Sequence, residues 1–115
     1  MQPDDRDIGY LNDMLRFARV AMELTEDRLG DEKTERMRQL ALERALEIIG
    51  EAARRVSEPF RDAHPEIPWK YIIGNRNVIA HNYDEIVLEV LWTTATRDVP
   101  KLVVALLALL PTEPE

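Results

Sequence analysis

Apolar residues recur at spacings of three and four along the first half of the chain, which is the pattern of helices that bury one face. The first such stripe consists of Ile8, Leu11, Leu15, Ala18 and Met22. It predicts a helix over residues 5–29. Asp4, Asp5 and Asp7 supply capping oxygens at its start, and Gly30 with Asp31 marks its end.

A second stripe predicts another long helix over residues 32–57. The stripe consists of Met37, Leu40 or Ala41, Ala45, Ile48 or Ile49, Ala52 and Val56. Gly50, Ala52 and Ala53 are small residues inside it, which favours close approach to another helix. Because the link between the two long helices is short, we expect them to lie antiparallel.

Prolines then interrupt the pattern and predict an irregular connection over residues 58–68. A third helical segment is expected to open at Trp69 and a fourth near Asp84. Pro100 is tolerated in the first turn of a helix, so residues 98–100 predict the start of a last helix that runs to Leu110. We expect residues 111–115 to form a short disordered tail. The side chains expected to be largely buried are Ile48, Ile49, Ala52, Trp69, Ile72 and Val90, with Trp69 packed beside the helix that carries the motif described below.

The composition agrees with an all-α protein, because Ala, Leu, Glu, Lys and Arg make up close to half of the chain and only 4 Gly interrupt it. A length of 115 residues favours one domain. We therefore expect residues 1–115 to form a single bundle of four to five helices, in which the first two are long.

Charge and cysteine content limit the possible functions. The net charge of −7 argues against strong non-specific binding of nucleic acid. With 0 Cys, the chain has no thiol nucleophile and no thiolate ligand for zinc, and its 2 His form no cluster with ligand spacing, so we expect neither a metal nor another cofactor. The polar, acidic start does not resemble a signal peptide, and the longest apolar run is far shorter than the roughly 20 residues of a membrane span. We expect a cytoplasmic protein without a membrane contact.

One segment, residues 74–84, combines amide, guanidinium, imidazole, carboxylate and phenol groups. On a helix, Arg76 and Tyr83 fall about 20° apart, and Asn77, His81 and Asp84 project on the same side, opposite the apolar residues of the segment. Arginine matches phosphate oxygens, and histidine titrates near neutral pH and can transfer a proton.

These groups suit RNA cleavage without a metal, in which a base removes the 2′-hydroxyl proton and an acid protonates the leaving oxygen. A single histidine cannot readily do both, so two motifs facing each other in a homodimer would supply the groups. The residue types alone equally allow a buried polar network in which Asp84 satisfies His81. His64, in the proline-rich connection, is interpreted as a surface or packing residue.

The pattern Arg76-Asn77-x-x-x-His81-x-Tyr83 resembles the Arg-x4-6-His signature of HEPN ribonucleases, and more narrowly the HepT-type toxins, whose motif ends in His-x-Tyr. Further similarity lies outside the motif, over nearly the whole chain. It comprises Gly50-Glu51-Ala52-Ala53, Ile67-Pro68-Trp69, and the spacing to Trp92, Asp98, Pro100 and Leu102.

The resemblance implies a HEPN bundle that acts as a homodimeric, metal-independent endoribonuclease toxin, with Arg76 and His81 catalytic at the dimer interface. Asn77 and Asp84 would support the imidazole. It also implies an antitoxin partner, a small MNT-type nucleotidyltransferase that transfers AMP to Tyr83. The alternative is a HEPN binding module that serves such a partner without cutting RNA, and the net charge of −7 favours this alternative.

Overall fold

The structure is a computed structural model that describes residues 2–26, 32–74 and 90–111. Within these ranges the chain is helical and contains no strand. The main elements are α1 (Asp5–Leu24), α2 (Glu32–Arg55), α3 (Glu58–Ala63), the π-helix η1 (Thr94–Asp98) and α6 (Val99–Leu109), and residues 69–74 and 90–93 are also helical. The predicted all-α class is confirmed.

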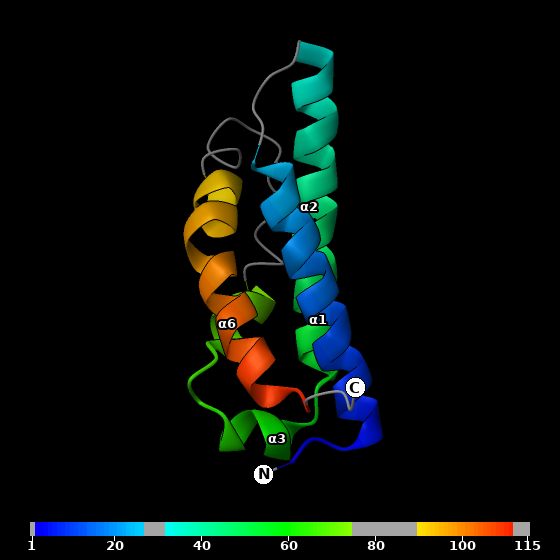
Figure 1. Cartoon of the computed structure of the whole chain (residues 1–115), viewed down its shortest axis with the longest axis vertical. Helices are drawn as coiled ribbons and strands as arrows, with labels where there is room; N and C mark the ends of the chain where they lie inside the picture. The colour runs from blue at the N-terminus through cyan, green and yellow to red at the C-terminus, as the bar shows by residue number, and fades with distance from the viewer. Residues whose placement is uncertain (1, 27–31, 75–89, 112–115) are drawn as a thin grey trace.

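The long helices α1 and α2 run antiparallel, and α6 packs along α1 on the other side (Figure 1). α1 starts where the sequence predicts, because the Asp4 carboxylate accepts a hydrogen bond from the backbone N–H of Asp7 at 2.8 Å. Asp7 itself has a different role from the one expected. Its buried carboxylate accepts hydrogen bonds from the backbone N–H and the hydroxyl of Ser57, at 2.8 and 2.6 Å, and so joins the start of α1 to the end of α2.

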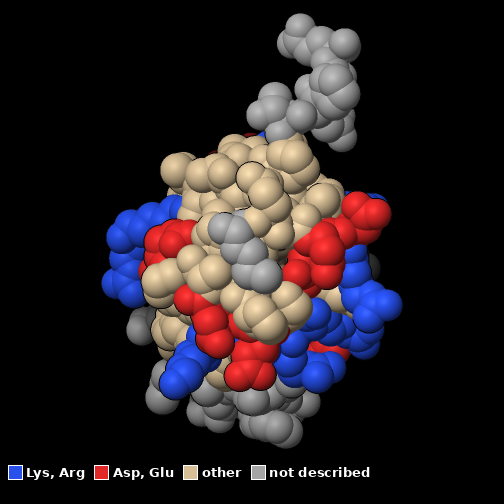
Figure 2. Space-filling model, turned by 90° about the horizontal axis from the view of Figure 1, so that it is seen from below, with Lys and Arg blue, Asp and Glu red and all other residues tan. Residues whose placement is uncertain are grey.

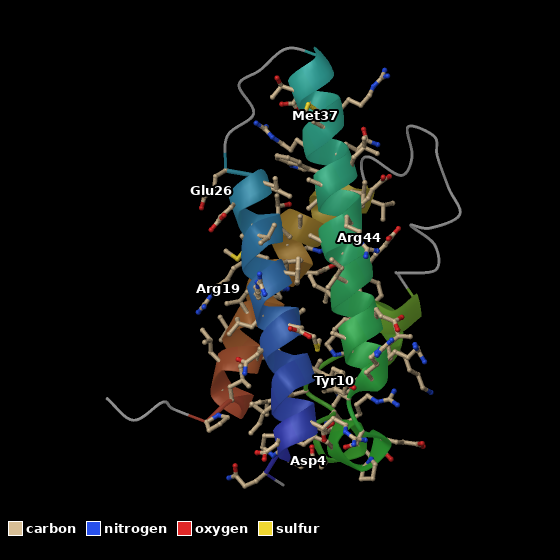
Figure 3. All side chains as sticks on the ribbon, turned by 90° about the vertical axis from the view of Figure 1, so that its right-hand side faces the viewer. Asp4, Tyr10, Arg19, Glu26, Met37 and Arg44 are labelled. Carbon is tan, nitrogen blue, oxygen red and sulfur yellow. The ribbon has the colours of Figure 1, made fainter. Side chains whose placement is uncertain are left out.

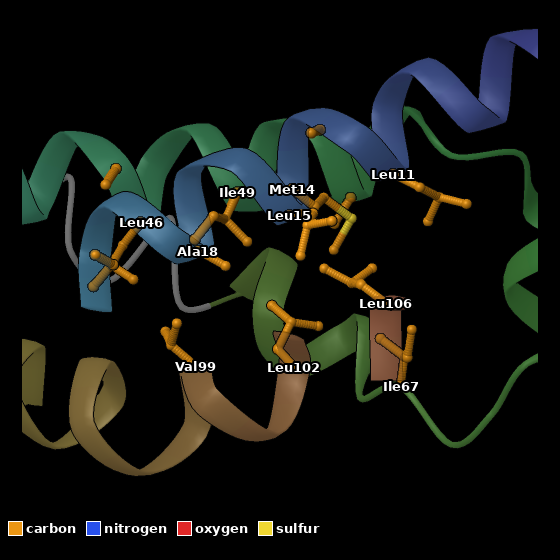
Figure 4. Close-up of a cluster of buried hydrophobic side chains, with 14 of the residues drawn as sticks. Leu11, Met14, Leu15, Ala18, Leu46, Ile49, Ile67, Val99, Leu102 and Leu106 are labelled. Atoms are coloured by element: carbon orange, nitrogen blue, oxygen red, sulfur yellow. The ribbon is translucent and has the colours of Figure 1, made fainter. Parts of the chain in front are cut away.

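One apolar core holds the three long helices together (Figure 4). Its central residues are Leu11, Met14, Leu46, Ile49, Ala53, Val56, Phe60, Ile67, Leu91, Leu102 and Leu106. Of the side chains predicted to be buried, Ile49, Ala52 and Trp69 are buried, whereas Ile48 and Ile72 are half-buried.

Several of the sequence predictions are wrong in detail. Val90 is 37% exposed, although Leu91 beside it is fully buried. Met37 and Leu40 are 62% and 59% exposed, because the N-terminal end of α2 extends beyond the end of α1 (Figure 1). The connection over residues 58–68 is only partly irregular, since it contains α3, whose first turn accommodates Pro59.

The last helix does not start afresh at Asp98. It continues from residues 90–93 through η1, where the backbone N–H of Val99 bonds to the carbonyl of Thr94, five residues earlier. Pro100 has no N–H to donate to the carbonyl four residues before it, so the wider turn is the form that lets the helix continue past the proline. Asp98 makes no capping hydrogen bond there. The predicted tail falls largely on residues 112–115, which lie outside the described residues.

Candidate functional site

The five site residues that the sequence predicts, Arg76, Asn77, His81, Tyr83 and Asp84, lie outside the described residues. Their geometry therefore stays a prediction. The structure describes the residues that precede and follow this segment in the chain, up to residue 74 and from residue 90 on.

On the N-terminal side, residues 60–69 form a braced unit. The indole N–H of Trp69, which is 7% exposed, donates a hydrogen bond to the backbone carbonyl of His64 at 2.9 Å. The His64 ring packs against Phe60 with 4.5 Å between ring centroids, and its Nδ1 pairs with the Glu66 carboxylate at 2.8 Å. A backbone hydrogen bond is the main cause that lowers the pKa of Glu66, and the pairing with His64 lowers it further. His64 is thus a packing residue, and Trp69 fixes the start of the helical residues 69–74. Whether Trp69 also contacts the motif lies outside the described residues.

The described residues before and after this segment are linked directly. The hydroxyl of Tyr71, five positions before Arg76, donates a hydrogen bond to the Asp98 carboxylate at 3.1 Å. Arg97 donates to the other oxygen of the same carboxylate at 3.2 Å. The chain before the motif is therefore tied to the chain that returns after it, at the junction between η1 and α6.

On α2, the small residues quoted for the resemblance are buried, since Ala52 and Ala53 are 4% and 0% exposed. Glu51, which directly precedes them, faces outward, where its carboxylate accepts hydrogen bonds from Arg54 at 2.7 Å and Arg55 at 3.0 Å. These hydrogen bonds lower the pKa of Glu51 to about 2, so its side chain is ionised at neutral pH. The network lies on the α1–α2 face, near the labelled Tyr10 and Arg44 (Figure 3).

A pocket of about 360 Å³ is not predicted by the sequence, although Tyr71 and Ile72, shortly before the motif in the chain, line it. Thr94, Lys101 and Ala105 contribute to it, and no spacing pattern in the sequence marks these residues.

Among the described residues, no group of three or more His, Cys, Asp or Glu side chains is placed to hold a metal ion. None of the helices in the described ranges is long and apolar enough to cross a membrane.

An all-helical bundle with two long antiparallel helices agrees with the class of HEPN proteins, which the Arg-x4-His motif of the sequence indicates. Comparison with known families makes the assignment narrower. Residues 12–109 match the family described as ribonuclease HepT-like, so the chain belongs to the HepT-like ribonuclease family.

Curated relatives agree with this family. A Methanocaldococcus jannaschii protein that bears the name of an RNase is 40% identical over 99 residues, which is 84% of this chain and 91% of that protein. A Thermococcus cleftensis protein that bears the name ribonuclease HepT is 40% identical over 98 residues, which is 81% of this chain and 86% of that protein. No solved structure matches the chain significantly.

Proposed function

We propose that the protein is a cytoplasmic endoribonuclease toxin that cleaves RNA without a metal ion. The observation that carries the proposal is the complete set of Arg76, His81 and Tyr83 within a chain of the HepT-like ribonuclease family. Arg76 would hold the phosphate through its planar guanidinium, and His81 would transfer the proton. Asn77 and Asp84 would orient the imidazole. A homodimer would bring two such sets together.

The test is cleavage of RNA by purified protein. The wild type should cleave RNA in EDTA and leave a 2′,3′-cyclic phosphate. Arg76→Ala and His81→Ala should each lower the rate at least 100-fold, given the usual share of general acid–base catalysis, while circular dichroism shows an unchanged fold. His64→Ala is the matched control, because it removes the other histidine outside the proposed site. Activity that EDTA abolishes and magnesium restores would refute the metal-independent mechanism.

The proposed partner is an MNT-type nucleotidyltransferase antitoxin that transfers AMP from ATP to the hydroxyl of Tyr83. An added phosphodiester would place a negative charge and bulk beside Arg76, where RNA phosphate is proposed to bind. Intact-mass measurement after incubation with the partner and ATP tests this. The wild type should gain mass in AMP-sized steps, and Tyr83→Phe should gain none and stay toxic in the presence of the partner. Tyr10→Phe is the control and should be modified like the wild type.

The alternative is a binding module that serves the partner without cleaving RNA. The net charge of −7 favours it, because a ribonuclease benefits from a positive field. On the end of the molecule that Figure 2 shows, acidic and basic side chains are interspersed. The cleavage assay separates the two functions: a binding module would form the complex with the partner and leave RNA intact at every enzyme concentration.

A further inference from the structure

The pocket of about 360 Å³ lies between α2, residues 65–72 and the junction of η1 with α6. Its walls are mainly apolar. Leu46 and Ile49 of α2 face Val99 and Leu102 of α6 across it (Figure 4). The volume falls within the range of small-molecule sites, roughly 300–1,000 Å³. The pocket can therefore take a flat apolar group.

One polar group in the wall has no hydrogen-bond partner among the residues that the structure describes. Thr94 lines the pocket and is only 6% exposed, and its hydroxyl makes no hydrogen bond with any other residue that the structure describes. A buried hydroxyl without a partner is unfavourable, so the pocket favours an occupant that offers a hydrogen-bonding edge. A purely aliphatic or phenyl side chain from a protein partner would leave this hydroxyl unsatisfied.

The charged residues that line the pocket are two carboxylates, Glu66 and Asp98, and one amine, Lys101. The Asp98 carboxylate already accepts hydrogen bonds from Tyr71 and Arg97, and the Glu66 carboxylate pairs with His64. Lys101 lines the pocket, is exposed, and forms no ion pair within the described part of the chain. Among the residues that line the pocket, Lys101 is therefore the cation available to a phosphate.

The pocket is also close to the proposed catalytic segment along the chain. Tyr71, which is 49% exposed, lines the pocket and precedes Arg76 by five residues. Consecutive Cα atoms are 3.8 Å apart, so the Cα atoms of these two residues are separated by at most about 19 Å, whatever the conformation between them. Exposed aromatic rings stack on nucleobases in many sites that bind single-stranded nucleic acid.

We infer that this pocket binds one nucleobase of the RNA strand, a few nucleotides from the phosphate that is cleaved. The Thr94 hydroxyl would bond to the edge of the base, Tyr71 would stack at the rim, and Lys101 would pair with a neighbouring phosphate. The inference rests on the proposed ribonuclease function and adds a site that selects the sequence of the RNA.

The first experiment uses the four nucleoside 5′-monophosphates as probes, with amide chemical shifts of the wild-type protein as the readout. At least one should shift the signals of Thr94, Lys101 and Ala105 in a saturable way. Ala105→Phe fills the pocket and should weaken this binding at least 10-fold. Val104→Phe is the matched control, because Val104 is one position away and 70% exposed. It should change this binding less than 2-fold.

Two further pairs keep the test decisive if Ala105→Phe does not fold. Thr94→Val removes only the hydroxyl and should weaken binding at least 3-fold, and the exposed Thr93→Val should not. Lys101→Glu should weaken binding at least 5-fold, whereas the exposed Lys70→Glu, away from the pocket, should not.

The second experiment compares cleavage of RNA with a randomised sequence. The wild type should prefer one base at a fixed distance from the cut, and Thr94→Val should reduce this preference at least 3-fold.

Cleavage with an unchanged preference in Ala105→Phe, or no mononucleotide shifts at the pocket, would overturn the inference and leave the ribonuclease function intact. Shifts caused by the nucleotidyltransferase partner and not by nucleotides would overturn it in favour of protein docking. Nucleotide binding at the pocket without any RNA cleavage would refute the proposed function and support the nucleotide site.

Discussion

At the scale of single residues, two carboxylates show how position decides the role of a side chain. Asp7 and Glu51 are both acidic residues within helices, but Asp7 is 3% exposed and bonded to Ser57, whereas Glu51 is bonded to exposed arginines. Buried hydrogen bonds to a charged group contribute more to stability than exposed ion pairs do. Replacing Asp7 should therefore destabilise the protein more than replacing Glu51 does.

Asp7→Ala should lower the free energy of unfolding by about 2–3 kcal/mol, because it leaves both donors of Ser57 without their partner. The measurement is the midpoint of urea unfolding. Asp5→Ala is the control, since Asp5 is exposed in the same first turn, and it should cost less than about 1 kcal/mol. Equal losses in the two variants would contradict the role assigned to Asp7.

Glu51 predicts a pH dependence. Its pKa of about 2 in the folded protein lies below the ordinary value of 4.5, so the folded state favours the ionised form. The resulting stabilisation is present above about pH 4.5 and is lost as the pH falls toward 2. Because the arginine partners are exposed, its size should stay below about 1 kcal/mol and shrink in high salt. The stability difference between the wild type and Glu51→Gln should therefore vanish between pH 5 and 2. A carboxyl titration near 4.5, followed by NMR, would contradict the hydrogen-bonded network.

At the scale of helices, α1 contains a glycine that packing does not require. Gly9 is exposed, and a Cβ atom added there would meet no atom within 4 Å. Gly9→Ala should therefore raise the free energy of unfolding by about 0.5–1 kcal/mol through helix propensity alone. Leu11→Ala on the same helix should lower it by about 2–5 kcal/mol, because Leu11 is fully buried. Destabilisation by Gly9→Ala would mean that a second chain approaches α1 at this position.

The sequence predicts where the helices lie in the chain better than it predicts which of their residues are exposed. Capping at Asp4, the start of a helix at Trp69 and the antiparallel long pair follow from local rules, and the structure has all three. The sequence prediction misses α3 because it treats Pro59 as a helix breaker, although proline fits the first turn of a helix. The exposure of Met37 and Val90 depends on which other element reaches them, and helical spacing alone does not contain that information.

The candidate site also has one part that the sequence predicts and another part that it does not. The Arg76–Tyr83 motif is visible in the sequence because its residue types are unusual together on one segment. The pocket is not visible there, because it joins α2, residues 65–72 and α6, which lie far apart in the chain. The hydrogen bond between Tyr71 and Asp98 is likewise not visible in the sequence, since 27 positions separate the two residues. Such features need the three-dimensional structure.

At the scale of the whole molecule, the proposed chemistry requires more than one chain. Each chain has one histidine in the motif, His81, whereas the proposed cleavage requires both a base and an acid. The two motifs are therefore expected to meet near the two-fold axis of a homodimer. Light scattering should give twice the mass of 13.3 kDa at micromolar concentration. A monomer under these conditions would contradict the shared site.

The absence of cysteine from the chain allows a direct test of where the two motifs lie. A single Asn82→Cys substitution places one thiol in the motif of each subunit. If the motifs face each other, oxidation should join the two chains, because a disulfide requires Cα atoms within about 7 Å. Asn12→Cys, on the exposed side of α1, is the matched control and should stay monomeric on a non-reducing gel. A short flexible bis-maleimide serves where the gap is wider. Cross-linking of Asn12→Cys and not of Asn82→Cys, in a protein that light scattering shows to be dimeric, would place the interface on α1 and contradict the shared site.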